Sequence, residues 1–163
     1  METAIAEWKD LFVAAAGASA ALAGLVFVAV SINLESIIKG KGLPERALVT
    51  LMLLVGVLIV SLFGLVPNQS EESLGTELLA LTGILSIAIG VFTVRSFPSG
   101  EMQLSWYVSR FVPVLFGTVP YVVGAAILIG GNAAGLDWIF AGMIGAIIAA
   151  VMNAWVLLVE ILR

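Results

Sequence analysis

The chain has 163 residues, of which 61% are hydrophobic and only 11% are charged, and its mean hydropathy is +1.17. About a quarter of the residues in a soluble domain are charged, so this composition indicates an integral membrane protein. The net charge of −4 argues against nucleic acid as a partner. The absence of Cys and His excludes disulfides, thiolate chemistry and the commonest general base.

Five apolar segments are long enough to cross a bilayer, whose hydrocarbon core of ~30 Å needs roughly 20 residues of helix. A charge or a turn signal bounds each segment. The predicted spans are 11–34, 47–66, 78–94, 111–129 and 138–159. The sequence therefore predicts an all-α, polytopic transmembrane helix bundle with five spans, forming a single domain over residues 1–163.

The first predicted span carries small residues at three- and four-residue spacing. This face holds Ala14, Gly17, Ala21 and Gly24, and it continues through Val28 to Ser31. Small residues allow helix backbones to approach closely in lipid, so the pattern indicates a helix-packing stripe. Two alternatives are open: packing within the chain, or a subunit interface or pore wall.

The other four spans pair into two hairpins, which allows an arrangement of one helix plus two hairpins. Between these pairs, residues 95–110 form the longest connection, which we interpret as a connecting helix on the membrane surface. The fourth span contains Gly117 and Pro120. Because proline lacks a backbone donor, a kink is expected there.

Orientation follows from the Lys and Arg residues. Six of the seven fall in the first connection, the third connection and the C-terminus, whereas Lys9 alone precedes the first span. Cytoplasmic loops are enriched in Lys and Arg, so we expect the N-terminus outside and the C-terminus in the cytoplasm. Three acids before the first span (Glu2, Glu7 and Asp10) also argue against a cleaved signal peptide.

Polar residues inside the spans are the candidate pathway-lining groups. The fifth span places Asn153 and Glu160 on one helical face, and Ser31 and Asn33 lie in the cytoplasmic third of the first span. The alternative is that Asn153 bonds a neighbouring helix, that Glu160 is solvated and that hydroxyls bond their own backbone. Three further hydroxyls fall in the outer part of their spans: Ser19, Ser61 and Ser86.

Residues 17–34 read GASAALAGLVFVAVSINL, and residues 43–48 read LPERAL. This part of the chain resembles the first helix of small prokaryotic multi-span membrane proteins of unassigned function. Some of these proteins are labelled as modulators of a membrane-bound protease. The resemblance implies a location in the cell (inner) membrane, and it implies no site residues.

No acid or base falls in the middle of a predicted span, and the sequence contains no HExxH, Walker or dinucleotide motif. We therefore expect no enzymatic activity, no cofactor and no metal. The sequence favours a homo-oligomeric, channel-like protein for small ions or solutes, surrounded by membrane lipid. The alternative is a non-catalytic regulatory or scaffolding protein that binds another membrane protein.

Overall fold

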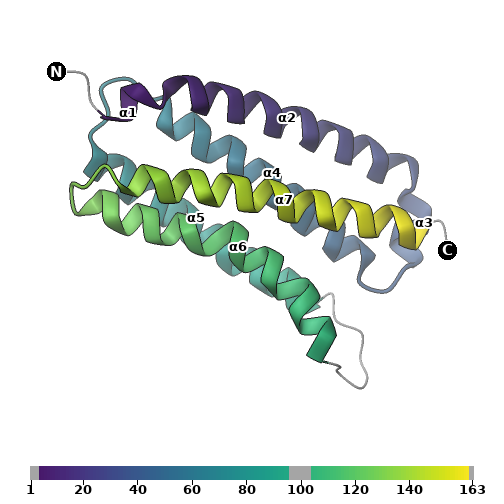
Figure 1. Ribbon diagram of the computed structural model, residues 1–163. Helices are drawn as coiled ribbons and strands as arrows, with labels where there is room; N and C mark the ends of the chain where they lie inside the picture. Colours follow the sequence, from purple (N-terminus) through teal and green to yellow (C-terminus); the bar gives the residue numbers. More distant parts are fainter. Residues whose placement is uncertain (1–3, 96–103, 162–163) are drawn as a thin grey trace.

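Helices make up nearly all of the described chain in the computed structural model of this protein (Figure 1). The structure describes the backbone of residues 4–95 and 104–161, and the side chains of all of these except residues 104–110, 113, 160 and 161. No strand occurs in these two ranges. The all-α prediction is confirmed.

Five long helices form the body of the molecule. They are α2 (Lys9–Ile32), α4 (Leu43–Gly64), α5 (Glu71–Arg95), α6 (Leu104–Ile129) and α7 (Gly135–Ile161), and the short helices α1 (Ala4–Glu7) and α3 (Leu34–Lys39) flank α2. Four of the described helices, α2, α4, α5 and α7, are long and apolar enough to cross a membrane. The apolar stretch described in α6, Val114–Ile129, is shorter. Each predicted span overlaps one of the five long helices.

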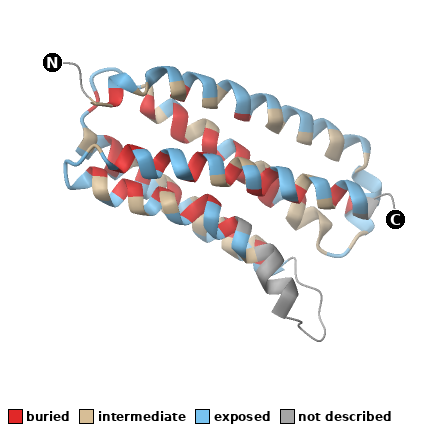
Figure 2. Cartoon of the chain, viewed as in Figure 1, coloured by how far each residue is buried: buried red, intermediate tan, exposed pale blue. Residues whose placement is uncertain are grey.

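Helices α4 to α7 close a four-helix bundle, in which each helix packs on the next and α7 packs back on α4. Helix α2 lies outside this bundle, mainly against α4 (Figure 1). The arrangement is one helix plus the hairpins α4–α5 and α6–α7. Buried residues are most frequent in α4 and least frequent in α2, whose outer face is exposed along its whole length (Figure 2).

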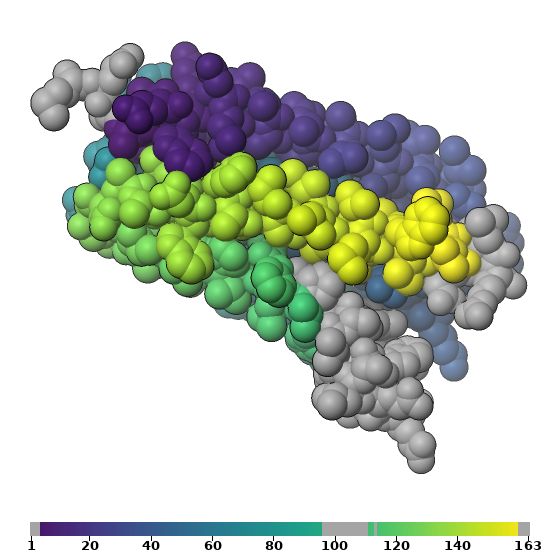
Figure 3. All heavy atoms as spheres, viewed as in Figure 1, coloured from purple at the N-terminus to yellow at the C-terminus, as the bar shows by residue number. Residues whose placement is uncertain are grey.

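Two aromatic contacts attach the N-terminal half of α2. The Phe12 side chain is only 1% exposed, and it lies against Gly64 at the end of α4. A Cβ atom at Gly64 would be 2.6 Å from the Phe12 ring, so a glycine is needed there. The Trp8 ring meets the Phe140 ring of α7 edge-on, with centroids 6.2 Å apart. In the space-filling view, α2 and α7 run side by side along one face (Figure 3).

Glycines bring α6 and α7 together. A Cβ atom at Gly124 would be 2.7 Å from the carbonyl oxygen of Gly135, and one at Gly117 would be 2.9 Å from the Cα atom of Ala146. Helix α6 continues as one element through Gly117 and Pro120, where the sequence led us to expect a kink. The position of Gly117 is therefore explained by close helix packing.

All five long helices begin before their predicted spans, and α5 and α6 begin earliest, by seven residues. Helix α5 begins at Glu71 rather than at residue 78, because Ser70 caps it: the Ser73 backbone N–H donates to the Ser70 Oγ atom at 3.2 Å. Glu71 and Glu72 in the first turn suit the positive end of the helix dipole. Helix α6 begins at Leu104 rather than at residue 111, so residues 104–110 belong to α6 instead of a separate surface helix. Residues 96–103 of that connection lie outside the described residues.

Candidate functional site

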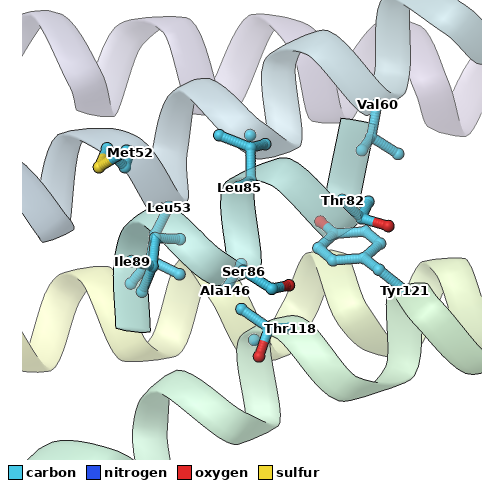
Figure 4. Close-up of a pocket in the computed structure, with 12 residues that line it drawn as sticks. Met52, Leu53, Val60, Thr82, Leu85, Ser86, Ile89, Thr118, Tyr121 and Ala146 are labelled. Carbon is cyan, nitrogen blue, oxygen red and sulfur yellow. The ribbon is translucent and has the colours of Figure 1, made fainter. Parts of the chain in front are cut away.

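A small hollow of about 20 Å³ lies inside the four-helix bundle, lined by all four helices (Figure 4). Most of its walls are apolar. Its polar groups are four hydroxyls, from Thr82 and Ser86 of α5 and from Thr118 and Tyr121 of α6. A cavity of this size holds about one water molecule, so it is far too small for a hydrated ion.

The two threonine hydroxyls of the hollow are bonded to their own helices. The Thr82 hydroxyl donates to the Leu78 carbonyl oxygen at 2.6 Å, and the Thr118 hydroxyl donates to the Val114 carbonyl oxygen at 2.9 Å. Both donors are thus satisfied one helical turn back along the chain, while lone pairs on both oxygens stay available as acceptors.

The Tyr121 side chain crosses the packing interface of α6 and α7. It is 5% exposed, and a Cβ atom at Gly142 of α7 would be 2.9 Å from its ring. Gly142 therefore provides the space that the ring occupies. Sequence reasoning missed Thr82, Thr118 and Tyr121. The available signal was the spacing, since Thr82 and Ser86 are four residues apart and Thr118 and Tyr121 are three apart.

Among the predicted pathway residues, Asn153 is buried at 7% exposure. Its Oδ1 atom accepts a hydrogen bond from the Nε atom of Arg46 at 3.4 Å. Arg46 lies in the first turn of α4, so this bond joins α4 to α7. The side chain of Glu160 lies outside the described residues.

The two predicted residues of the first span bond back to α2. The Ser31 hydroxyl is exposed and donates to the Phe27 carbonyl oxygen at 2.8 Å, and the Asn33 side-chain amide donates to the Ala29 carbonyl oxygen at 2.9 Å. No hydrogen bond among the described residues joins either of them to Asn153. A pathway lined by these residues therefore stays a prediction.

The three serines that the sequence places in the outer part of their spans have different surroundings. Ser19 and Ser61 are fully buried, and they donate to the carbonyl oxygens of Ala16 and Val57 in their own helices at 3.1 and 2.8 Å. Ser86 instead lines the central hollow.

The stripe of small residues on α2 faces away from the rest of the chain. Ala14, Gly17, Ala21 and Gly24 are all exposed, and a Cβ atom added at either glycine would meet nothing within 4 Å. The small residues of α7 behave in the opposite way: Gly142, Ala146 and Ala149 are buried. The small residues of α7 thus pack against other helices of the same chain, whereas those of α2 make no such contact.

A larger hollow of about 240 Å³ lies between α2, α3 and α7. All its lining residues are apolar, with Ala29 and Val30 on α2, Ile37 on α3 and Leu157 on α7 among them. Such a surface offers no group that recognises an ion.

No family model, curated protein or solved structure matches the chain. Within residues 4–95 and 104–161, no group of three Asp or Glu side chains is placed to hold a metal ion. The resemblance to small prokaryotic membrane proteins therefore stays a prediction.

Proposed function

We propose that this protein crosses the cell membrane five times, with its N-terminus outside and its C-terminus in the cytoplasm. The lengths and apolar composition of α2, α4, α5 and α7 support this proposal, together with the apolar stretch of α6. Helix α1 and the α4–α5 and α6–α7 turns lie at one end of the bundle (Figure 1). Lys39 at the end of α3, Lys41 in the turn after it and Arg46 in the first turn of α4 lie at the other end, which is the charge distribution expected for the cytoplasmic side.

The protein acts as a non-catalytic, homo-oligomeric assembly in which the outward face of α2 contacts the neighbouring copy. The observation that carries this proposal is the open space around Gly17 and Gly24. Glycine in a helix interior costs roughly 1 kcal/mol relative to alanine when it makes no compensating contact. In lipid that cost is offset where a second helix packs closely on the glycine face.

A second outward face with open glycines lies on α5. A Cβ atom at Gly83 or Gly90 would also meet nothing within 4 Å. Helix α4 contacts both α2 and α5. If α2 of one copy packs on α5 of the next, the contact is head-to-tail and forms a ring when the rotation between copies closes, whereas α2 against α2 gives a two-fold dimer.

In such an assembly the ion path of the channel runs through the space between copies. The central hollow of a single chain holds about one water molecule, so an ion path through one copy has no support. Ser31 is exposed on the same helix as the open glycines and supplies a hydroxyl for such a path. The second candidate function, a scaffold for another membrane protein, uses the same outward face of α2 as its docking surface.

Cysteine cross-linking combined with ion flux tests these proposals in liposomes containing the full chain. The ring predicts a cross-link when chains carrying Gly24→Cys are mixed with chains carrying Gly83→Cys. Neither variant alone is then expected to cross-link. The two-fold dimer predicts cross-linking of Gly24→Cys with itself. Flux of Na⁺, K⁺ or Cl⁻ above that of empty liposomes supports the channel.

Assembly without flux favours the scaffold, since the copies then associate without a pathway. Absence of both cross-links, together with single-step photobleaching of labelled chains, contradicts the homo-oligomer.

A further inference from the structure

The larger hollow, of about 240 Å³, lies between the C-terminal half of α2 and the C-terminal part of α7. The two helices meet near their other ends, where the Trp8 ring contacts the Phe140 ring. Between residues 20 and 32, α2 has no buried residue, so the rest of the chain packs only loosely on this half of the helix. Ile37 of α3 also lines the hollow, which therefore extends to the end of the bundle where α2 leads into α3.

The walls of this hollow suit a hydrocarbon. All eight lining residues are Leu, Val, Ile or Ala. An apolar cavity stays dry and takes up apolar molecules, because water finds no hydrogen-bonding partner in it. A hydrocarbon chain instead gains dispersion contacts with α2, α3 and α7 together, whereas the flat outside of one helix offers contacts on one side only.

The hollow is also open at its edges. Leu25 of α2 is 69% exposed and Leu158 of α7 is 45% exposed, although both line it. In the proposed membrane crossing these edges face the bilayer, so an acyl chain enters sideways without leaving hydrocarbon. A helix of a second copy is ~10–12 Å wide with its side chains, which is too wide for a hollow of this volume.

The charge at this end of the bundle favours an anionic headgroup. Lys41, in the turn after α3, is exposed and forms no ion pair with any described residue. The other charged residues of residues 34–50 and of the C-terminus have opposite signs in pairs: Glu35 and Lys39, Glu45 and Arg46, Glu160 and Arg163. Lys41 is therefore the excess positive charge next to the hollow, and basic residues between helices at the cytoplasmic surface attract anionic lipid headgroups.

We propose that the hollow between α2, α3 and α7 binds one acyl chain of an anionic phospholipid from the cytoplasmic leaflet, with the phosphate group of that lipid beside Lys41. The acyl chain fills the space that the protein leaves between α2 and α7, and the headgroup selects the lipid. This lipid site rests on the proposed membrane crossing, and it is independent of whether the copies form a ring or a dimer.

Photo-cross-linking tests the site in phosphatidylcholine liposomes that contain the full chain. The probe is phosphatidylglycerol with a diazirine on one acyl chain, and mass spectrometry identifies the labelled residues. We expect residues 25–30 and 154–158 to be labelled more strongly than Ile87 and Val91, which are exposed on α5 and report on the surrounding lipid. A phosphatidylcholine probe with the same diazirine is expected to label the hollow about fivefold less, the effect of one basic residue near a membrane surface.

Substitutions separate the acyl chain from the headgroup. Ala154→Phe and Ala29→Phe each fill the hollow from one wall, so labelling there is expected to fall to the level of Ile87 and Val91. Ala141→Phe is the matched control, because Ala141 is exposed on α7 and does not line the hollow. Lys41→Gln keeps the hollow and is expected to remove the preference for phosphatidylglycerol.

Three results each overturn the lipid site: labelling of the hollow equal to that of Ile87 and Val91, equal labelling by the two probes, or undiminished labelling in both phenylalanine variants of the hollow. Failure of the membrane crossing gives a different result, in which neither the hollow nor Ile87 and Val91 are labelled. That result overturns both proposals, whereas labelling of Ile87 and Val91 without an excess in the hollow overturns the lipid site alone.

Discussion

Pro120 removes a backbone hydrogen bond of α6 one turn earlier, at the Phe116 carbonyl oxygen. Because proline has no N–H group, the Phe116 carbonyl oxygen has no donor four residues ahead. In the structure Gly145 of α7 lies against this oxygen, so that an added Cβ atom at Gly145 would collide with it. The glycine thus lets the two backbones meet where the helix has lost a hydrogen bond, with a Cα–H group directed at the carbonyl.

Gly145→Ala is therefore expected to lower the free energy of unfolding by about 2 kcal/mol, since neither backbone is able to move without disturbing the α6–α7 interface. The matched control is Gly83→Ala on α5, where the added methyl group meets nothing within 4 Å. That substitution is expected to leave stability unchanged or to raise it slightly. Detergent unfolding of both variants makes the comparison, and equal losses would contradict the packing role of Gly145.

Asn153 connects α7 to the first turn of α4 through Arg46. A double-mutant cycle of Asn153→Leu and Arg46→Met isolates this bond, which is expected to contribute about 0.6 kcal/mol, the typical value for an interhelical hydrogen bond in a membrane protein. Additive losses of stability would show that the two side chains act independently. If Asn153→Leu instead leaves stability unchanged and abolishes ion flux, the amide serves a pathway rather than packing.

At the scale of whole helices, α2 and α7 have the same pattern of small residues, but the surroundings of those residues differ. Both have small residues at three- and four-residue spacing, yet those of α7 are buried and those of α2 are exposed. The inner face of α2 includes instead Phe12, Ser19 and Leu22, which are buried or half-buried against the bundle. The pattern predicts close packing in both helices, and only the three-dimensional arrangement decides whether the partner helix belongs to the same chain.

Substitutions on the two faces of α2 are expected to separate assembly from stability. Gly17→Leu and Ala21→Leu add bulk to the outer face, so they are expected to reduce cross-linking between copies and to leave the unfolding of a single chain unchanged. Leu22→Ala removes apolar contacts with the bundle, and a loss of about 2 kcal/mol in unfolding free energy is expected, with assembly intact.

Subunit counting by photobleaching and thermal unfolding in detergent provide the two readouts. A loss of chain stability in Gly17→Leu equal to that in Leu22→Ala would place the outer face of α2 in contacts within the chain.

At the scale of the whole molecule, the connections sort by charge between the two ends of the bundle. A cysteine at the exposed Ser70, before α5, is expected to react with a membrane-impermeant reagent added outside intact cells. A cysteine at the exposed Lys41, between α3 and α4, is expected to react only after the membrane is permeabilised. Ser99→Cys, in the segment outside the described residues, is expected to behave like Lys41→Cys. The reverse labelling pattern would overturn the orientation.

The helical class and the positions of the five long helices were predictable from the sequence alone. In lipid every backbone polar group must be satisfied within its own segment, so an uncharged run of sufficient length has almost no alternative to a helix. Helix ends were less predictable, because a cap such as Ser70 extends α5 through the charged residues Glu71 and Glu72, which ended the apolar run.

The faces of the helices and the contents of the core were decided by the tertiary structure. Hydroxyl groups on α5 and α6 meet in one hollow, and Arg46 reaches Asn153 across 107 residues of sequence. In a water-soluble protein the polar face of each helix marks the outside, and a sequence reveals that face. In a chain that is apolar on all sides this signal is absent, so only the packing of the helices on one another determines that the small residues of α7 lie inside and those of α2 outside.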